Sequence, residues 1–211
     1  MQTVCLRKFI SRYELDKLVL ESHGCIVACG ALGADGVFAF AHFAEIFEPF
    51  NHLGRVIGFD TFEGFPSISA RDRSVNSDTE SEFFHKRGLR SDPLNEILKA
   101  KEIFDGSRPL KHLNRVEFVK GDAILTIPAY LISHPELIVS LLWLDLDIYE
   151  PTLVALKSFV PRMSKGSIIA FDELNHPLWP GETIAVLEAL QIQESQLKRF
   201  PFGSTVSYIQ I

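Results

Sequence analysis

Acidic residues directly follow four apolar segments of this chain. The segments "RVIGFD", "RVEFVKGD", "LLWLDLD" and "GSIIAFDE" end at Asp60, at Asp122, at Asp145 and Asp147, and at Asp172 and Glu173. An unpaired carboxylate in a dry protein interior costs several kcal/mol. We therefore expect these acids at exposed strand ends, beside a cation, or both.

Short apolar segments alternate with helical segments along most of the chain. "HGCIVACG" precedes a glycine-rich turn and the helical segment 37–50, and further helical segments follow at 125–134, 151–163 and 181–191. This order predicts an α/β fold with a Rossmann-like, doubly wound and mostly parallel sheet. The closing "STVSYIQI" alternates apolar and polar residues, which predicts an antiparallel edge strand at the C-terminus.

Two further segments complete the predicted organisation. Segment 3–22 is expected to be an amphipathic helix whose apolar stripe leaves Leu15 aside and comprises Leu6, Phe9, Ile10, Tyr13, Leu18 and Leu20. Residues 65–112 interrupt the alternation with a polar stretch and a helical segment at 93–106, and are expected to form a helical lid. A chain of 211 residues buries one sizeable core, so residues 1–211 are expected to form a single domain.

Composition excludes several classes of protein. A net charge of −6 argues against nucleic-acid binding, which relies on clustered cations. No apolar run approaches the roughly 20 residues that span a bilayer, and the N-terminus lacks a secretory signal. Cys5, Cys25 and Cys29 show no metal-ligand spacing, and buried thiols in a reducing cytoplasm are the expectation.

The acids at the strand ends predict a binding site. Parallel strands place their carboxyl ends on one edge of the sheet, where ligands of open α/β folds bind. Asp145 and Asp172 lie about one strand–helix crossover apart, so their strands are expected to be neighbours and Glu173 to lie beside them. Three carboxylates favour Mg²⁺ over Zn²⁺. Any single Asp here is also compatible with a helix cap or a loop anchor.

Asp60 and Asp122 are candidates for contact with a nucleoside. An acid that ends the second strand is placed to accept hydrogen bonds from ribose hydroxyls, in NAD or in S-adenosylmethionine. The loop "CGALGADG" lacks the G-x-G-x-x-G pattern that cradles a dinucleotide pyrophosphate, which counts against an NAD-dependent oxidoreductase. Asp122 in "KGDA" suits an adenine edge or a plain turn.

Three segments carry a resemblance to a known family. "GFDTFEGFP", "LLWLDLDIYEPTLVAL" and "GSIIAFDELNHPLWPGETIAVLEAL" resemble the macrocin O-methyltransferases, metal-dependent enzymes that act on sugars in natural-product assembly. The resemblance implies a methyltransferase fold, bound S-adenosylmethionine, Mg²⁺ that grips two vicinal hydroxyls of a small-molecule acceptor, and a homodimer. The cofactor-binding residues it implies are Cys29, Gly30, Asp60, Thr61, Phe62, Gly121, Asp122 and Asp145.

The resemblance also implies catalytic roles. Asp145, Asp172 and Glu173 match the metal triad, although the third ligand is usually Asp. Asp147 matches a proposed general base, with a cap for the helix after Pro151 as its alternative role. From the residues themselves, His176 is a candidate acid or base. Trp179 is a candidate sugar platform or, alternatively, an apolar anchor for its loop.

The chain departs from the family pattern in its first loop. Ala28 stands where the family usually carries Glu, and Gly33, Ala34 and Asp35 replace the usual Arg or Lys, Gly, Gly. Ala34 is expected to crowd a backbone that needs positive φ. Asp35 is expected either to repel the carboxylate of the cofactor or to attract its sulfonium. Two hypotheses follow: an O-methyltransferase with weakened cofactor affinity, or a non-catalytic relative that binds a nucleoside or acceptor without methyl transfer.

Overall fold

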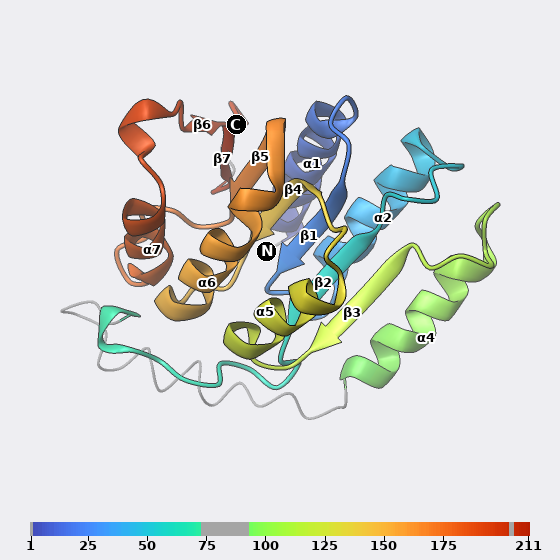
Figure 1. Ribbon diagram of the computed structural model, residues 1–211, viewed down its shortest axis with the longest axis horizontal. Helices are drawn as coiled ribbons and strands as arrows, with labels where there is room; N and C mark the ends of the chain where they lie inside the picture. The colour runs from blue at the N-terminus through green and yellow to red at the C-terminus, as the bar shows by residue number, and fades with distance from the viewer. Residues whose placement is uncertain (1, 73–92, 203–204) are drawn as a thin grey trace.

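A seven-stranded mixed sheet with helices on both faces forms the molecule (Figure 1). The structure, a computed structural model, describes residues 2–72, 93–202 and 205–211. The strands are β1 (Cys25–Cys29), β2 (Val56–Asp60), β3 (Val116–Lys120), β4 (Val139–Leu144), β5 (Met163–Phe171), β6 (Lys198–Arg199) and β7 (Ser207–Gln210). The longer helices are α1 (Gln2–Val19), α2 (Asp35–Phe47), α4 (Pro93–Gly106), α5 (Ala123–Ser133), α6 (Tyr149–Phe159) and α7 (Gly181–Ala189).

The strand order is β3-β2-β1-β4-β5-β7-β6, with the first five strands parallel. This confirms the predicted doubly wound sheet, and β4 and β5 are neighbours as expected, with Leu144 paired to Phe171. β7 runs antiparallel to β5, as predicted. It is not the outermost strand, because the short β6 pairs with its free side.

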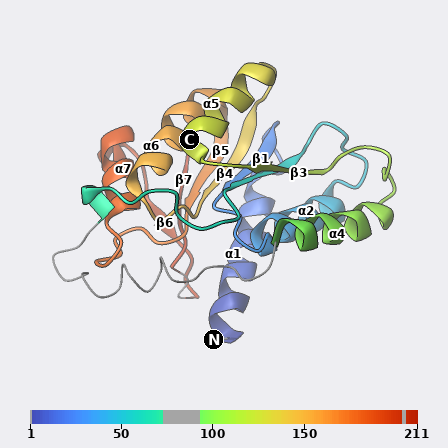
Figure 2. The same cartoon turned by 90° about the horizontal axis from the view of Figure 1, so that it is seen from below.

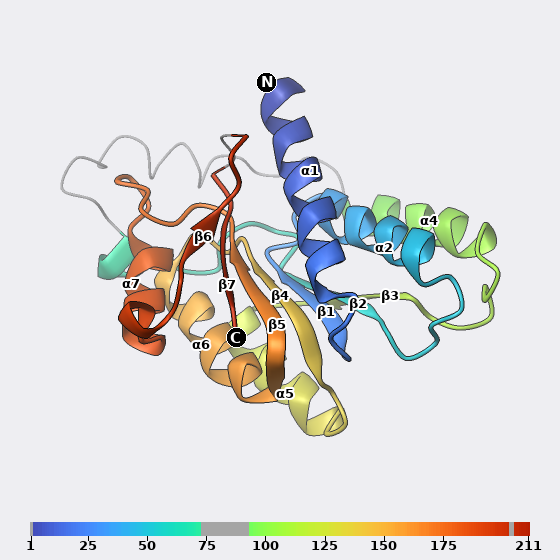
Figure 3. The same cartoon turned by 90° about the horizontal axis from the view of Figure 1, so that it is seen from above.

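Two layers of helices cover the sheet (Figures 2 and 3). α1, α2 and α4 lie on one face and α5, α6 and α7 on the other. Side chains of a strand alternate between the two faces. In β4, Leu141 and Trp143 therefore join the core under α1 and α2, while Leu142 and Leu144 join the core under α5 and α6. Strands buried on both faces explain the continuous apolar runs in the sequence.

The predicted apolar stripe of α1 was wrong. Leu6 is 61% exposed and Phe9 45%, whereas Leu15, which lies off that stripe, is fully buried. The buried face of α1 also holds Arg12 and Asp16. Periodicity missed this face because it contains charged side chains that find partners only in the folded chain.

The predicted lid is described only at its two ends. Residues 61–72 leave β2 and end in a short 3₁₀ helix, Ala70–Asp72, beside α7 (Figure 1). There Asp72 accepts a hydrogen bond of 2.6 Å from the Tyr149 backbone N–H. At the other end, α4 lies beside α2, where Phe104 contacts Phe38. Residues 73–92 lie outside the described residues, so closure over the site stays a prediction.

Other sequence predictions are answered within the described part of the chain. Cys25 and Cys29 are buried thiols, as expected. None of the helices in residues 2–72, 93–202 and 205–211 is long and apolar enough to cross a membrane.

Candidate functional site

Backbone hydrogen bonds bring the carboxyl ends of the parallel strands together in one row. The N–H of Gly121 donates to Asp60, that of Asp145 to Cys29 at 2.9 Å, and that of Asp172 to Leu144 at 3.0 Å. Each bond joins the residue after one strand to the end of its neighbour. The predicted site residues from four different segments therefore lie along a single edge of the sheet.

Gly30 allows the ends of β1 and β4 to touch. Its φ is +90°, and a Cβ at this position would lie 1.9 Å from the carbonyl oxygen of Asp145. No other residue type fits this contact without moving the backbone. Gly30 therefore sets the position of Asp145 relative to the first loop.

Acidic side chains gather beside the ends of β4 and β5. Asp172 is 1% exposed, and its Oδ1 has no hydrogen-bond partner among the described residues. Burial raises the pKa of Asp145, and the nearby Asp172 and Asp147 raise it further. Glu182, in the first turn of α7, was not predicted and is 1% exposed. Burial and the same acids raise the pKa of Glu182 as well.

The backbone of Asp147 is left-handed, with a φ of 61°, so the chain does not continue as an extended strand from Asp145 to Asp147. Asp147 does not cap α6, because the N-cap residue is Ile148 and the N–H of Tyr149, the first residue of the helix, donates to Asp72. Burial, Glu173 and Asp172 raise the pKa of Asp147 to about 7. A carboxyl group with that pKa is suited to accept a proton near neutral pH.

Two cations from α1 reach this edge of the sheet. The Lys8 ammonium forms an ion pair with Asp172. One turn later, Arg12 lies 4.9 Å from the centre of the Trp143 ring and pairs with Asp35 at 3.1 Å. Neither residue was predicted, since only the tertiary fold brings α1 over the acids. A hint was available: they are four residues apart and so share one helix face.

The chemistry of these residues suits a divalent cation, although the metal centre is not preassembled. Orphaned oxygens on Asp172 and Glu182, surrounded by other carboxylates, are hard donors of the type that Mg²⁺ takes. Within the described ranges, no three His, Cys, Asp or Glu side chains are already gathered as a metal centre.

The first loop combines strain with compensation. Ala34 has φ 58° and ψ 11°, as anticipated, and it precedes α2 without a side-chain cap. A left-handed residue other than Gly costs about 1–2 kcal/mol. The charge of Asp35 is offset by Arg12, which reduces the expected repulsion of a cofactor carboxylate. The altered loop therefore keeps a defined fold.

Asp60, at the end of β2, lies beside the first loop. Its Oδ1 accepts a hydrogen bond of 2.6 Å from the Phe62 N–H. Burial raises the pKa of Asp60, and backbone N–H groups, including those of Ala31 and Leu32 in the first loop, offset part of the rise. The following turn holds Thr61, whose hydroxyl donates to the carbonyl of Gly64 at 2.5 Å. Asp60 thus faces the first loop.

Asp122 and the loop after β5 have local structural roles. Asp122 caps α5 by accepting a hydrogen bond of 3.0 Å from the Ile124 N–H, which is the turn role weighed against adenine binding. Trp179 lies 6.3 Å from Phe65, centre to centre, and so joins its loop to the start of the insertion. His176 is half-buried, and its Nδ1 has no hydrogen-bond partner among the described residues.

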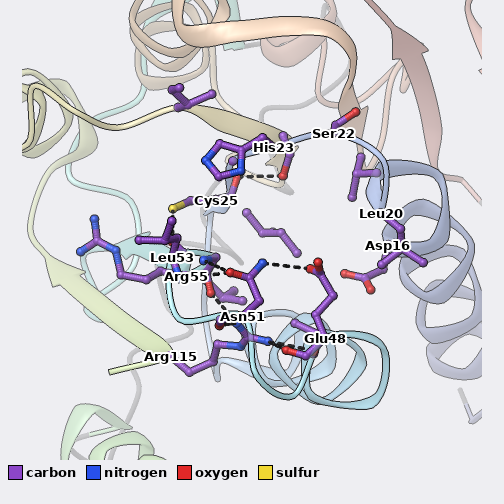
Figure 4. A pocket seen from close by; sticks show the side chains of 18 of the residues that line it. Asp16, Leu20, Ser22, His23, Cys25, Glu48, Asn51, Leu53, Arg55 and Arg115 are labelled. Carbon is purple, nitrogen blue, oxygen red and sulfur yellow. Dashed lines mark hydrogen bonds between the residues drawn. The ribbon is translucent and has the colours of Figure 1, made fainter. Parts of the chain in front are cut away.

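A separate cavity of about 660 Å³ opens at the opposite edge of the sheet (Figure 4). It lies among the residues that begin β1, β2 and β4, and it contains none of the predicted site residues. Asp16 and Glu48 point toward each other within it. Burial and Glu48 raise the pKa of Asp16 to about 7. The predicted site is therefore at the carboxyl edge, away from this cavity.

Known proteins resemble this chain in sequence and in fold. No family model matches the chain. A curated tetracenomycin-C 4'-O-methyltransferase of Streptomyces olivaceus, which acts on a dimethoxyrhamnosyl derivative, is 29% identical over 119 residues, 56% of this chain. The match spans 41% of that enzyme. The structure of the O-methyltransferase NovP shares the fold, with a TM-score of 0.71 at 18% identity over 96% of this chain and 78% of its own.

CalS11, a calicheamicin methyltransferase, is more similar. Its crystal structure superposes with a TM-score of 0.89 at 32% identity, over 97% of this chain and 79% of that one. An apo structure, which names CalS11 a TDP-rhamnose 3'-O-methyltransferase, gives 0.82 at 29% over the same shares. Identity at this level extends over nearly the whole chain, and it is found together with the row of strand-end acids described above. This chain therefore belongs to the macrocin O-methyltransferase family of class I S-adenosylmethionine-dependent methyltransferases.

Proposed function

We propose that this protein is an S-adenosylmethionine-dependent O-methyltransferase that requires Mg²⁺ and acts on a sugar hydroxyl of a natural-product intermediate. The observation that carries the proposal is the row of acids at one sheet edge, in a chain that is 32% identical to CalS11. The rhamnose units named for two relatives suggest a deoxyhexose with vicinal hydroxyls as the acceptor.

The proposed cofactor position runs from the first loop to the end of β3. The backbone of Cys29 and Gly30 forms the base of the proposed cofactor site. Asp60 accepts hydrogen bonds from the ribose hydroxyls, and the turn of Thr61 and Phe62 forms one wall. Gly121 and Asp122 border the base, and Asp145 faces the centre of the edge. The backbone hydrogen bonds between the ends of neighbouring strands support this assignment, because they join all four segments.

The proposed acceptor position lies beside the acids of β4 and β5. Asp145, Asp172 and Glu173 would hold Mg²⁺, which when bound supplies Lewis-acid activation of a poorly nucleophilic hydroxyl. Asp147 takes the hydroxyl proton, and His176 is the second candidate for proton transfer. The chain's own contribution is to hold the acceptor oxygen in line with the methyl group of the sulfonium. We propose a homodimer and a cytoplasmic location as well.

One observation favours a second candidate, a relative that binds nucleoside or acceptor without methyl transfer. Ala34 sits in a strained left-handed conformation in the loop that should receive the cofactor. A transfer assay separates the candidates: the protein is incubated with methyl-labelled S-adenosylmethionine, TDP-rhamnose and Mg²⁺. We expect labelled sugar from the wild type and none from Asp147→Asn.

Binding is measured on the same samples. S-adenosylhomocysteine should raise the melting temperature and NAD should not, because a ligand stabilises only the state it binds. A shift with S-adenosylhomocysteine but no transfer to any rhamnosyl acceptor favours the non-catalytic candidate. No shift with S-adenosylhomocysteine contradicts the proposed function.

A further inference from the structure

Lys8 occupies the place of a cation in the acidic cluster. Its ammonium pairs with Asp172, whose side chain is 1% exposed, while the Lys8 side chain is 26% exposed. Asp145 and Glu173 also attract this ammonium, since both help to raise the pKa of Lys8 against the effect of its burial. The three acids around Lys8 are the three that we propose as ligands of Mg²⁺.

A lysine and a divalent ion cannot both use these oxygens fully. Crowded carboxylates need a counter-charge, and a half-buried ammonium provides one positive charge where Mg²⁺ would provide two. Lys8 engages Asp172 Oδ2, whereas Oδ1 has no hydrogen-bond partner among the described residues.

We propose that Lys8 is an internal counter-cation that competes with a divalent ion for Asp172, so that the Lys8 side chain must withdraw when the ion binds. The inference rests on the proposed function, because it takes its metal site from there. It adds a positioning residue from α1, a helix that contributes no ligand. The arrangement offsets part of the negative charge of the acids until the ion arrives.

Calorimetric titration with Mn²⁺ tests the competition directly. Lys8→Met keeps the apolar stem and removes the charge, and Lys8→Arg keeps the charge. Lys17→Met is a control that removes a lysine of α1 that pairs with Glu14 and lies over the Tyr13 ring, away from the acidic cluster. We expect Lys8→Met to bind Mn²⁺ about 10- to 100-fold more tightly than the wild type, the range of a hydrogen bond between charged groups. Lys8→Arg and Lys17→Met should bind like the wild type.

A second readout needs no substitution. In the wild type, Mn²⁺ should increase acylation of Lys8 by an amine-reactive reagent, measured by mass spectrometry relative to Lys17, because the ammonium leaves its partner. Equal Mn²⁺ affinity in wild type and Lys8→Met, abolished in both by Asp145→Ala, overturns the role of Lys8 and leaves the metal site standing. Mn²⁺ binding by no variant overturns both.

Discussion

Gly30 offers the sharpest test of how the site is built, because alanine there meets backbone rather than a movable side chain. The new Cβ would lie 1.9 Å from the oxygen of Asp145 and must move by about 1.5 Å to reach ordinary contact at 3.4 Å. The shift would break the bond from the Asp145 N–H to the carbonyl of Cys29.

The cost can be worked out from three effects. Overpacking costs about 1–3 kcal/mol. A side chain at positive φ costs about 1–2 kcal/mol. The lost backbone hydrogen bond costs about 0.5–1.5 kcal/mol. We therefore expect Gly30→Ala to lower the free energy of unfolding by about 2.5–6.5 kcal/mol, a large part of the about 5–15 kcal/mol typical of a domain.

Gly33→Ala is the matched control, because Gly33 has φ +68° but no described atom within 4 Å of the position that a Cβ would take. Only the cost of positive φ remains there, about 1 kcal/mol. Both variants are compared with the wild type by denaturant unfolding followed by circular dichroism. Equal losses in the two variants would refute the close approach of β1 and β4.

Three more substitutions test other parts of the structure. Burial places the pKa of Asp16 near 7, above the 3.8 of the unfolded chain, so the free energy of unfolding should fall as pH rises from about 4 to 7. Asp16→Asn should remove this fall and raise the free energy of unfolding by about 2–4 kcal/mol at pH 8. A loss of stability at pH 8 in that variant contradicts the assignment. Arg115→Lys should lower the free energy of unfolding in urea by about 3 kcal/mol or more, because the 2% exposed guanidinium donates to four carbonyls that an ammonium cannot reach together. A loss below about 1 kcal/mol counts against this role of Arg115 in holding the four carbonyls. Asp122→Ala should lose about 1 kcal/mol of stability through its cap to Ile124, and unchanged affinity for S-adenosylhomocysteine would remove Asp122 from the cofactor site.

The strand-end acids were predictable because two local rules place them. Apolar runs define the strands, and parallel strands end on a common edge, so Asp60, Asp145 and Asp172 had to share that edge. The left-handed Ala34 was also predictable, since the family pattern has Gly there. These inferences needed no knowledge of how distant segments meet.

The parts that sequence reasoning missed depend on tertiary contact. α1 was expected to bury its most apolar stripe, but its buried face includes Arg12, because the acids and Trp143 beside it make a buried cation favourable. Lys8 was missed for the same reason, because only the tertiary fold brings it beside the acids. Asp147 adopts a left-handed conformation that no periodicity reveals, and Glu182 is buried only because α7 begins beside the acids.

Crystals grown with S-adenosylhomocysteine and Mn²⁺ provide the most direct measurement of the central claim, that strand-end acids form a shared cofactor and metal site. Anomalous scattering of manganese locates the ion independently of the protein coordinates. We expect one strong peak between Asp145 and Asp172, with the ribose hydroxyls on Asp60. A manganese peak elsewhere, or none with the nucleoside bound away from this edge, would contradict the claim.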